Sequence, residues 1–340
     1  MSKTQWKQIG VGAATLALLT LLMFWVFRDS WQEILYNIRA VRPGGLFLLL
    51  GMGTVYQLFE AATCMVLIRG QFSKFSFRQA VEVTFLGVFA NVSTLSVGVV
   101  PMQSWYLYRQ GMLVGSGAGV MTLEYALHKS SVLLYTTLLL IVQRRWFQES
   151  RTGLSRYLLL GYLICAVIIA ALILLCTWNR AQRLAKWGIS RLPDTGKWGQ
   201  RKDVWERNLS ALYRQSRNLM QDRKRLGTAL LLNALKLLCL YSVPFVCAQA
   251  LYVPALSFWR MNLLAALMHL ISNALPNVAG VGPVEFAFMM IFPHFMGYAE
   301  ASSALILYRV ATFFFPFLLS VFVFLAVSKE GFSRTHQENK

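Results

Sequence analysis

Apolar residues run almost without interruption for about 20 positions in several parts of the chain. The clearest of these runs are 9–27, 45–68, 117–142, 156–177, 227–252 and 300–328. A helix needs about 20 consecutive apolar residues to cross the ~30 Å hydrocarbon core of a bilayer. The pattern therefore predicts an all-α, polytopic membrane protein with about six full transmembrane helices.

Two further apolar stretches, 82–108 and 258–292, are interrupted near their centres. The first contains the polar, Gly- and Pro-bearing segment Asn91–Pro101, and the second contains Asn273–Pro283. Irregular backbone at membrane depth is tolerated only where protein buries it or where it lines a wet cavity. We therefore expect two broken helical segments, which either cross the membrane or re-enter by the face they came from.

The distribution of basic residues favours re-entry. If both broken segments crossed the membrane, the basic stretch 178–226 would lie opposite Lys3 and Lys7. If both are re-entrant, the N-terminus, this stretch and the tail from Lys329 share one side, although three arginines between 144 and 151 fit poorly. Because cytoplasmic loops carry an excess of Lys and Arg, we predict two re-entrant segments and cytoplasmic termini.

This topology makes residues 1–340 one membrane domain built from two related halves. Each half contains a span, a broken segment and a second span, and the two halves have opposite orientation. Inverted repeats whose discontinuous helices meet near the midplane are typical of secondary transporters. The predicted divisions are the first half 9–177, a basic linker 178–226, the second half 227–328 and a cytoplasmic tail 329–340.

Composition supports the membrane assignment and changes the meaning of the charge. The chain is 56% hydrophobic and 14% charged, whereas soluble domains carry about 25% charged residues. Its net charge of +19 then indicates Lys and Arg retained near anionic lipid at the cytoplasmic face, not nucleic-acid binding. The five cysteines lack metal-ligand spacing, and no catalytic or nucleotide-binding motif is present. We therefore expect no enzyme activity, no cofactor and no metal.

The linker 178–226 carries 13 Lys and Arg against 4 Asp and Glu. Apolar residues on one predicted helical face are Trp198, Trp205, Leu209, Leu212, Leu219 and Met220. Such a helix is expected to lie on the inner leaflet with its apolar face down and its cations at anionic head groups. The alternative is a soluble loop that only enforces topology. The residues expected at the lipid surface are Trp198, Arg201, Lys202, Trp205, Arg207, Arg214 and Arg217.

Ionisable residues inside the apolar runs are the candidates for chemistry. A charge at the bilayer centre costs at least ~2.5 kcal/mol, so such residues usually face a cavity or a partner. They are Glu60, Glu124, His128, Lys129, Lys236, His269, Glu285 and Arg309.

Because buried charges need partners, three pairings are expected among them. Glu124 and His128 share a helix face because they are four residues apart. We expect Lys129 to pair with Glu60 or Glu285, and Arg309 to pair with Glu285. His269 is expected to be structural.

The unwound segment Asn273–Pro283 is expected to expose backbone amides to an anionic group. The residues concerned are Asn273, Asn277 and the backbone of Gly280 and Gly282.

The run Pro276–Glu285 resembles the P-x-P-G-G-x-G-x-x-E signature of the lysylphosphatidylglycerol synthase/flippase transmembrane region, the YbhN-like family. Pro276, Gly280, Gly282 and Glu285 match, whereas Val278 and Ala279 depart from the signature. Asn91 and the stretch 105–111 resemble the first-half motif, and Glu124 aligns with an acidic residue of the following span. The resemblance covers about residues 10–328 and implies a module that moves modified phospholipid between leaflets. The cytosolic aminoacyltransferase domain of the full synthases is not expected in this chain.

The leading hypothesis is a flippase-like protein that moves or handles an anionic phospholipid or polyprenyl-linked lipid in a bacterial inner membrane. An alternative is a non-transporting partner that presents lipid to a separate envelope-lipid or glycan enzyme. A third hypothesis is an intramembrane transferase that uses Glu124 and His128 as acid and base. The expected substrate-binding residues are Asn91, Glu124, His128, Lys129, Asn273, Pro276, Asn277, Gly280, Gly282, Glu285 and Arg309.

Overall fold

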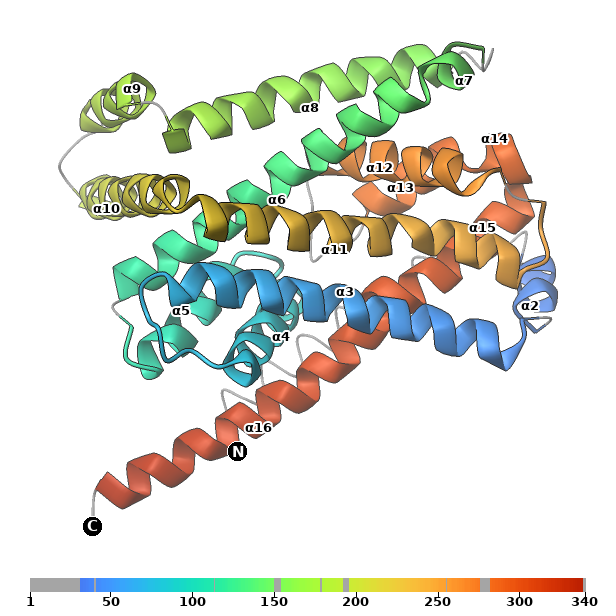
Figure 1. Cartoon of the computed structure of the whole chain (residues 1–340). Helices are drawn as coiled ribbons and strands as arrows, with labels where there is room; N and C mark the ends of the chain where they lie inside the picture. Colours follow the sequence, from blue (N-terminus) through green and yellow to red (C-terminus); the bar gives the residue numbers. More distant parts are fainter. Residues whose placement is uncertain are drawn as a thin grey trace.

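The computed structural model describes residues 31–39, 41–112, 114–149, 154–177, 179–191, 196–254, 256–275 and 282–338. Within this part of the chain every regular element is a helix, and there is no strand (Figure 1). The helical stretches long and apolar enough to cross a membrane are Pro43–Arg69, Ser116–Val142, Arg223–Ala250 and Tyr298–Lys329. The predicted all-α, polytopic class is confirmed, while the first predicted span, 9–27, lies outside the described residues.

The other predicted spans all correspond to helices. Four of them are α3 (Pro43–Arg69), α6 (Val114–Val142), α8 (Leu154–Thr177) and α11 (Arg223–Ala250). The last span is a continuous run of α15 (Tyr298–Arg309), the π-helix η2 (Val310–Phe314) and α16 (Phe315–Glu338). Short helices that the apolar pattern did not predict are α2 (Trp31–Arg39), α7 (Arg144–Glu149), α9 (Asn179–Ser190) and α14 (Pro293–Met296).

The first broken segment is a helical hairpin made of α4 (Phe77–Ser93) and α5 (Val99–Arg109), which pack against each other. The hydroxyl of Thr94 accepts a hydrogen bond from the Gly98 amide at 2.7 Å and organises the turn between them. Leu95 and Ser96 have φ angles of 52° and 71°. Positive φ in residues other than glycine is strained and clusters at functional sites. The turn is therefore a strained tip and not a simple loop.

The second broken segment consists of α12 (Phe258–Ala274) and α13 (Pro283–Ile291), which also pack against each other. Pro283 stands at the first position of α13, where its missing amide hydrogen costs no helical hydrogen bond. Gly282 immediately before it has φ +100°, a conformation that favours glycine. Both interruptions predicted from polar, Gly and Pro residues are thus breaks between two helices.

The two halves pack on each other reciprocally (Figure 1). Helix α3 of the first half lies along α11 of the second. The first hairpin packs through α4 on α16, the last helix of the second half. In return, α12 of the second broken segment packs on α6, the last helix of the first half's triplet of span, broken segment and span. Each broken segment therefore packs on the last span of the other predicted half.

The ends of the helices separate into two groups. At one end, the Gln71 amide donates a hydrogen bond to Gln215, which joins the segment after α3 to the basic linker. At the other end, the Arg42 guanidinium lies 5.3 Å from the ring centre of Tyr252, which joins the start of α3 to the segment after α11. The basic linker and the loop after α3 therefore lie together, as the charge distribution predicted.

The predicted amphipathic helix is α10 (Gly196–Gln221), which packs along α6. Trp205, Arg214 and Arg217 on α10 are exposed. Leu219 is buried against the protein, so its placement on the lipid-facing side is wrong; the reason is that α10 docks its last turns onto the bundle. Lys202 contacts the Ser190 carbonyl at 3.4 Å. The side chains of Trp198, Arg201 and Arg207 lie outside the described part of the structure.

Candidate functional site

A partly open cavity of about 850 Å³ lies between the two broken segments. The first segment contributes Asn91 and Ser96 to its lining, and the second contributes Ser272, Asn273 and Pro283. Helices α3 and α6 and the π-helix η2 complete the walls. Binding pockets for small molecules usually measure ~300–1,000 Å³, so the cavity has room for a lipid head group.

Lys129 on α6 marks the basic side of this cavity. Its ammonium donates a hydrogen bond to the Asn273 side-chain oxygen at 2.5 Å and lies 5.0 Å from the ring centre of Tyr125. Among the described residues, no carboxylate lies within ion-pair distance of Lys129. Tyr125 and Asn273 are exposed and so mark the cavity mouth.

The two pairings predicted for Lys129 are both wrong. Glu60 pairs with Lys236, and Glu285 pairs with Arg309. These partners belong to helices far from Lys129 in the sequence, so spacing along the chain gave no information about them. Within the described part of the chain, Lys129 therefore has no carboxylate in direct ion-pair contact.

Two carboxyl groups mark the acidic side of the cavity. Glu60 on α3 forms an ion pair with Lys236 on α11, whose side chain is fully buried at 0% exposure. Glu124 on α6 is 8% exposed, and its carboxyl group interacts with that of Glu60. The Oε1 atom of Glu124 is buried and has no hydrogen-bond partner among the described residues. Lys236 therefore pairs directly with Glu60 and attracts the carboxyl group of Glu124 from farther away.

Buried polar atoms without partners in the described structure gather in the cavity wall. Besides Glu124, they include the Ser96 hydroxyl and the Nδ1 atom of His128. Native proteins leave few such groups unsatisfied, because each one costs free energy. His269 was expected to be structural and does hydrogen-bond Tyr308 at 2.6 Å, but it also lines the cavity. The wall therefore contains polar groups that are available to form hydrogen bonds with a ligand.

Glu285 and Arg309 form the predicted ion pair, with the Arg309 Nε donating to Glu285 at 2.6 Å. Neither residue is in the cavity lining, so the prediction that they contact the head group is not supported by the geometry. The second oxygen of Glu285 accepts a hydrogen bond from the Gly282 amide at 2.8 Å. The Gly282 amide was expected to bind an anion, but Glu285 already occupies it. The pair joins the start of α13 to the end of α15.

The π-helix η2 follows Arg309 directly and brings Thr312 and Phe313 into the cavity wall. It packs on α3 at Gly53, where a Cβ atom would lie 1.9 Å from the Ala311 carbonyl oxygen. Only glycine permits this approach. Single π-turns inside α-helices occur frequently at functional sites.

Some of the residues that the sequence predicted to bind substrate line the cavity, and others do not. The predicted residues that line the cavity are Asn91, Glu124, His128, Lys129 and Asn273. Pro276, Asn277 and Gly280 lie outside the described residues. Uncharged polar residues that were missed include Gln57, Thr84, Ser96 and Gln103. The signal available for them was a polar residue within an apolar run, which is weaker than a charge.

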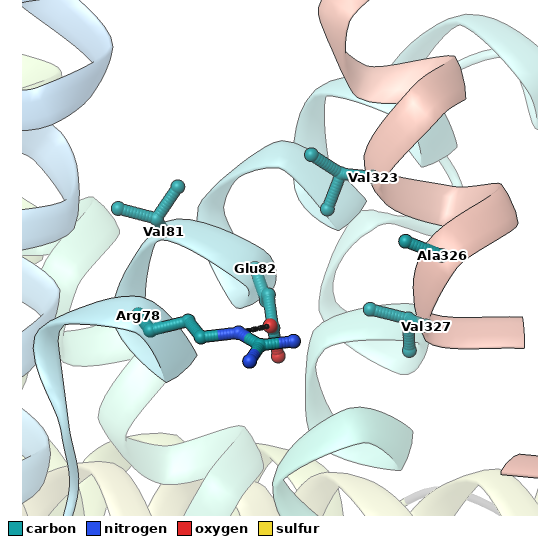
Figure 2. Close-up of a pocket in the computed structure, with 6 residues that line it drawn as sticks. All are labelled: Arg78, Val81, Glu82, Val323, Ala326 and Val327. Carbon is teal, nitrogen blue, oxygen red and sulfur yellow. Dashed lines mark hydrogen bonds and ion pairs between the residues drawn. The ribbon is translucent and has the colours of Figure 1, made fainter. Parts of the chain in front are cut away.

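A second hollow of about 430 Å³ lies between α4 and α16 (Figure 2). Valine and alanine side chains form most of its wall, and the ion pair of Arg78 with Glu82 lies on its α4 side (Figure 2). The Arg78 side chain is 73% exposed. The hollow contains no unpartnered buried polar group among the described residues, so the cavity between the broken segments is the candidate site.

The described part of the chain contains no group of three or more His, Cys, Asp or Glu side chains placed to hold a metal ion. Among known families, the model described as "Lysylphosphatidylglycerol synthase TM region" matches residues 12–320. No curated protein matches the chain. The matched range includes both broken segments, the basic linker and all the residues of the cavity wall.

Proposed function

The chain belongs to the family of lysylphosphatidylglycerol synthase TM regions, and we propose that it moves a phosphate-bearing lipid between the two leaflets of its membrane. One observation carries the proposal. Both broken segments line a single cavity that contains a lysine ammonium with no carboxylate partner among the described residues. The proposal starts from the family, which is one of multi-pass membrane proteins.

The ammonium of Lys129 is the proposed phosphate contact. An uncompensated charge inside a membrane costs at least ~2.5 kcal/mol, and an anionic ligand would remove this cost. Asn273 holds the lysine at the cavity mouth, and its amide group offers a further hydrogen bond. Charge-assisted hydrogen bonds to phosphate are stronger than neutral ones. The site therefore favours a head group that carries a phosphate.

The cavity suits passage of a head group because its wall is built from both halves of the inverted repeat. In transporters of this architecture, one repeat rocks against the other around a fixed site. Here Asn91 and Ser96 belong to one half and Asn273 belongs to the other. The polar wall would replace the water around the head group while the acyl chains stay in the surrounding bilayer.

The basic end of the molecule supports a direction for loading. Exposed Arg214 and Arg217 on α10 lie at the same end as the loop after α3. Each basic residue near an anionic membrane surface contributes ~1 kcal/mol of attraction. We place this end on the cytoplasmic side of a bacterial inner membrane, where it would gather anionic lipid.

The test is leaflet redistribution of fluorescent lipids in proteoliposomes containing the purified full chain. Phosphatidylglycerol and a polyprenyl phosphate serve as two separate probes. In vesicles with wild type, at least one probe should become accessible to a membrane-impermeant quencher faster than in protein-free vesicles. Lys129→Met should slow this exposure at least tenfold, because it removes the phosphate contact.

Arg39→Met is the control, since Arg39 is exposed at the end of α2, at the opposite end of the bundle from α10 (Figure 1) and outside the cavity. It should leave the rate unchanged. If wild type moves neither probe, transport is rejected in favour of the alternative, a partner that presents lipid to a separate enzyme. Equal loss in Lys129→Met and Arg39→Met would reject the site but not the activity.

A further inference from the structure

Lys236 on the acidic side of the cavity has a consequence beyond lipid binding. Glu60, Glu124 and Lys236 come from α3, α6 and α11, three helices that pack against one another. Together they carry a charge of −1 when both carboxyl groups are ionised, and zero when one of them holds a proton. Since a charge buried in a membrane is costly, this cluster has a reason to bind one proton.

The geometry gives that proton a place and a path. The Oε1 atom of Glu124 is buried without a hydrogen-bond partner among the described residues, and Glu124 lines the cavity. Glu60 lines the same cavity, whereas Lys236 stands behind it at 0% exposure. A proton from a hydronium ion in the cavity can therefore reach either carboxyl oxygen and leave water behind. Lys236 itself is not part of the cavity lining.

We infer that Glu60 and Glu124, held by Lys236, form a site for one exchangeable proton that drives lipid movement. The coupling to lipid movement rests on the proposed function. The proton site itself does not depend on whether lipid moves. The ammonium of Lys236 repels a metal cation such as sodium from the same carboxyl groups. A proton is the coupling ion that the cluster accommodates.

The surrounding charged and titratable groups define the setting. Groups that face the two carboxyls are Tyr56 and Cys64 from α3 and Lys236 from α11. His128 from α6 lines the same cavity. Farther along the wall, Lys129 from α6 and His269 from α12 line the same cavity. Behind the wall, Glu285 and Arg309 neutralise each other.

The proton site and the phosphate contact lie on the same helix. Glu124 and Lys129 are five residues apart on α6, about 7.5 Å along its axis. A phosphate at Lys129 would be repelled by an ionised Glu124 at roughly 10 Å, which weakens its binding on the order of tenfold at an effective dielectric of ~20. Proton binding would restore that affinity, and by linkage the phosphate would favour the proton to the same extent.

The proton site is tested by infrared difference spectra of the full chain in nanodiscs, recorded between acid and alkaline buffer. Wild type should show the carbonyl band of a protonated carboxyl group that disappears on alkalinisation. Glu124→Gln should remove this band, and Glu124→Asp, which keeps a carboxyl group, should shift it. Glu300→Gln, in the first turn of α15 and outside the cavity, is the control and should leave it unchanged.

The coupling is tested in proteoliposomes with labelled phosphatidylglycerol. A pH gradient of one unit should produce up to about a tenfold difference in lipid concentration between the leaflets. The reason is that one proton moving down a tenfold gradient releases enough free energy for a tenfold lipid gradient. A sodium gradient at equal pH should produce none.

Each outcome decides a different point. A band that persists unchanged in Glu124→Gln and in Glu60→Gln overturns the proton site. An asymmetry that follows sodium, or that ignores pH, overturns the coupling. If wild type moves no lipid under any gradient, the proposed function fails and the coupling with it, while the infrared bands still decide the proton site.

Discussion

The ion pair of Glu285 with Arg309 provides a quantitative test of how the second broken segment is held. The Arg309 side chain is 6% exposed and that of Glu285 is 16% exposed. Removing one member of a buried pair costs ~3–5 kcal/mol, because the other charge is left without its counter-ion. Glu285→Gln keeps an oxygen for the Gly282 amide, and Arg309 keeps its contact with the Phe313 ring at 4.9 Å. We therefore expect a loss near the lower limit, about 3 kcal/mol.

The assay is unfolding of the full chain in mixed micelles by added SDS, followed by tryptophan fluorescence. The double variant Glu285→Gln/Arg309→Met should lose less stability than the sum of the two single variants, since it leaves no unpaired charge. Arg78→Gln removes a guanidinium that is 73% exposed in its pair with Glu82; it is the comparison and should cost less than about 1 kcal/mol. A loss below ~1 kcal/mol for Glu285→Gln would refute the reasoning, because exposed pairs contribute that amount.

Three further predictions concern the backbone and the basic helix. Gly53→Ala should destabilise the protein by ~1–3 kcal/mol in the same unfolding assay, because its Cβ would meet the Ala311 carbonyl oxygen in η2. Gly51→Ala is the control, because a Cβ there has open space and should cost no stability. Equal effects of the two substitutions would contradict the close packing. Ser96→Gly should raise stability by about 1 kcal/mol, since glycine adopts φ 71° without strain, and a loss of stability would exclude strain at the hairpin tip. Arg214→Gln and Arg217→Gln should each lower the local preference for anionic lipid by ~1 kcal/mol. The measurement is tryptophan quenching by brominated phosphatidylglycerol in nanodiscs, which should decrease. Unchanged quenching would contradict the placement of α10 at the lipid surface.

The sequence was sufficient for the architecture because membrane insertion constrains it strongly. Five of the six predicted spans correspond to helices, and the interruptions at Asn91–Pro101 and Asn273–Pro283 are breaks between paired helices. Where polar, Gly and Pro residues interrupt an apolar run at membrane depth, the helix usually breaks against protein or a wet cavity. Local composition therefore carried information about tertiary structure.

Side-chain partners could be predicted from the sequence only where few oppositely charged residues were available. Arg309 was paired correctly because Glu285 was the natural acidic partner in the neighbouring broken segment. Lys129 was paired wrongly because its contact with Asn273 depends on how α6 packs on α12. The pair of Glu60 with Lys236 spans 176 positions and was not predicted. No sequence period encodes such a distance.

The π-helix and the strained tip were also invisible in the sequence. The residues Val310–Phe314 lie inside an apolar run and include no helix-breaking residue themselves, and their π conformation accompanies the close packing of η2 against Gly53. Leu95 and Ser96 are not residues that favour positive φ, so only the structure shows their strain. Both η2 and Ser96 line the cavity, and such departures from sequence preference are expected at a functional site.

The central claim is that the cavity between the broken segments binds a lipid phosphate. The most direct measurement is a cryo-electron microscopy map of the full chain in nanodiscs made with phosphatidylglycerol. We expect head-group density within hydrogen-bond distance of the Lys129 ammonium and the Asn273 side chain, and loss of that density in Lys129→Met. A wild-type map with ordered lipid elsewhere on the protein and none in this cavity would contradict the claim.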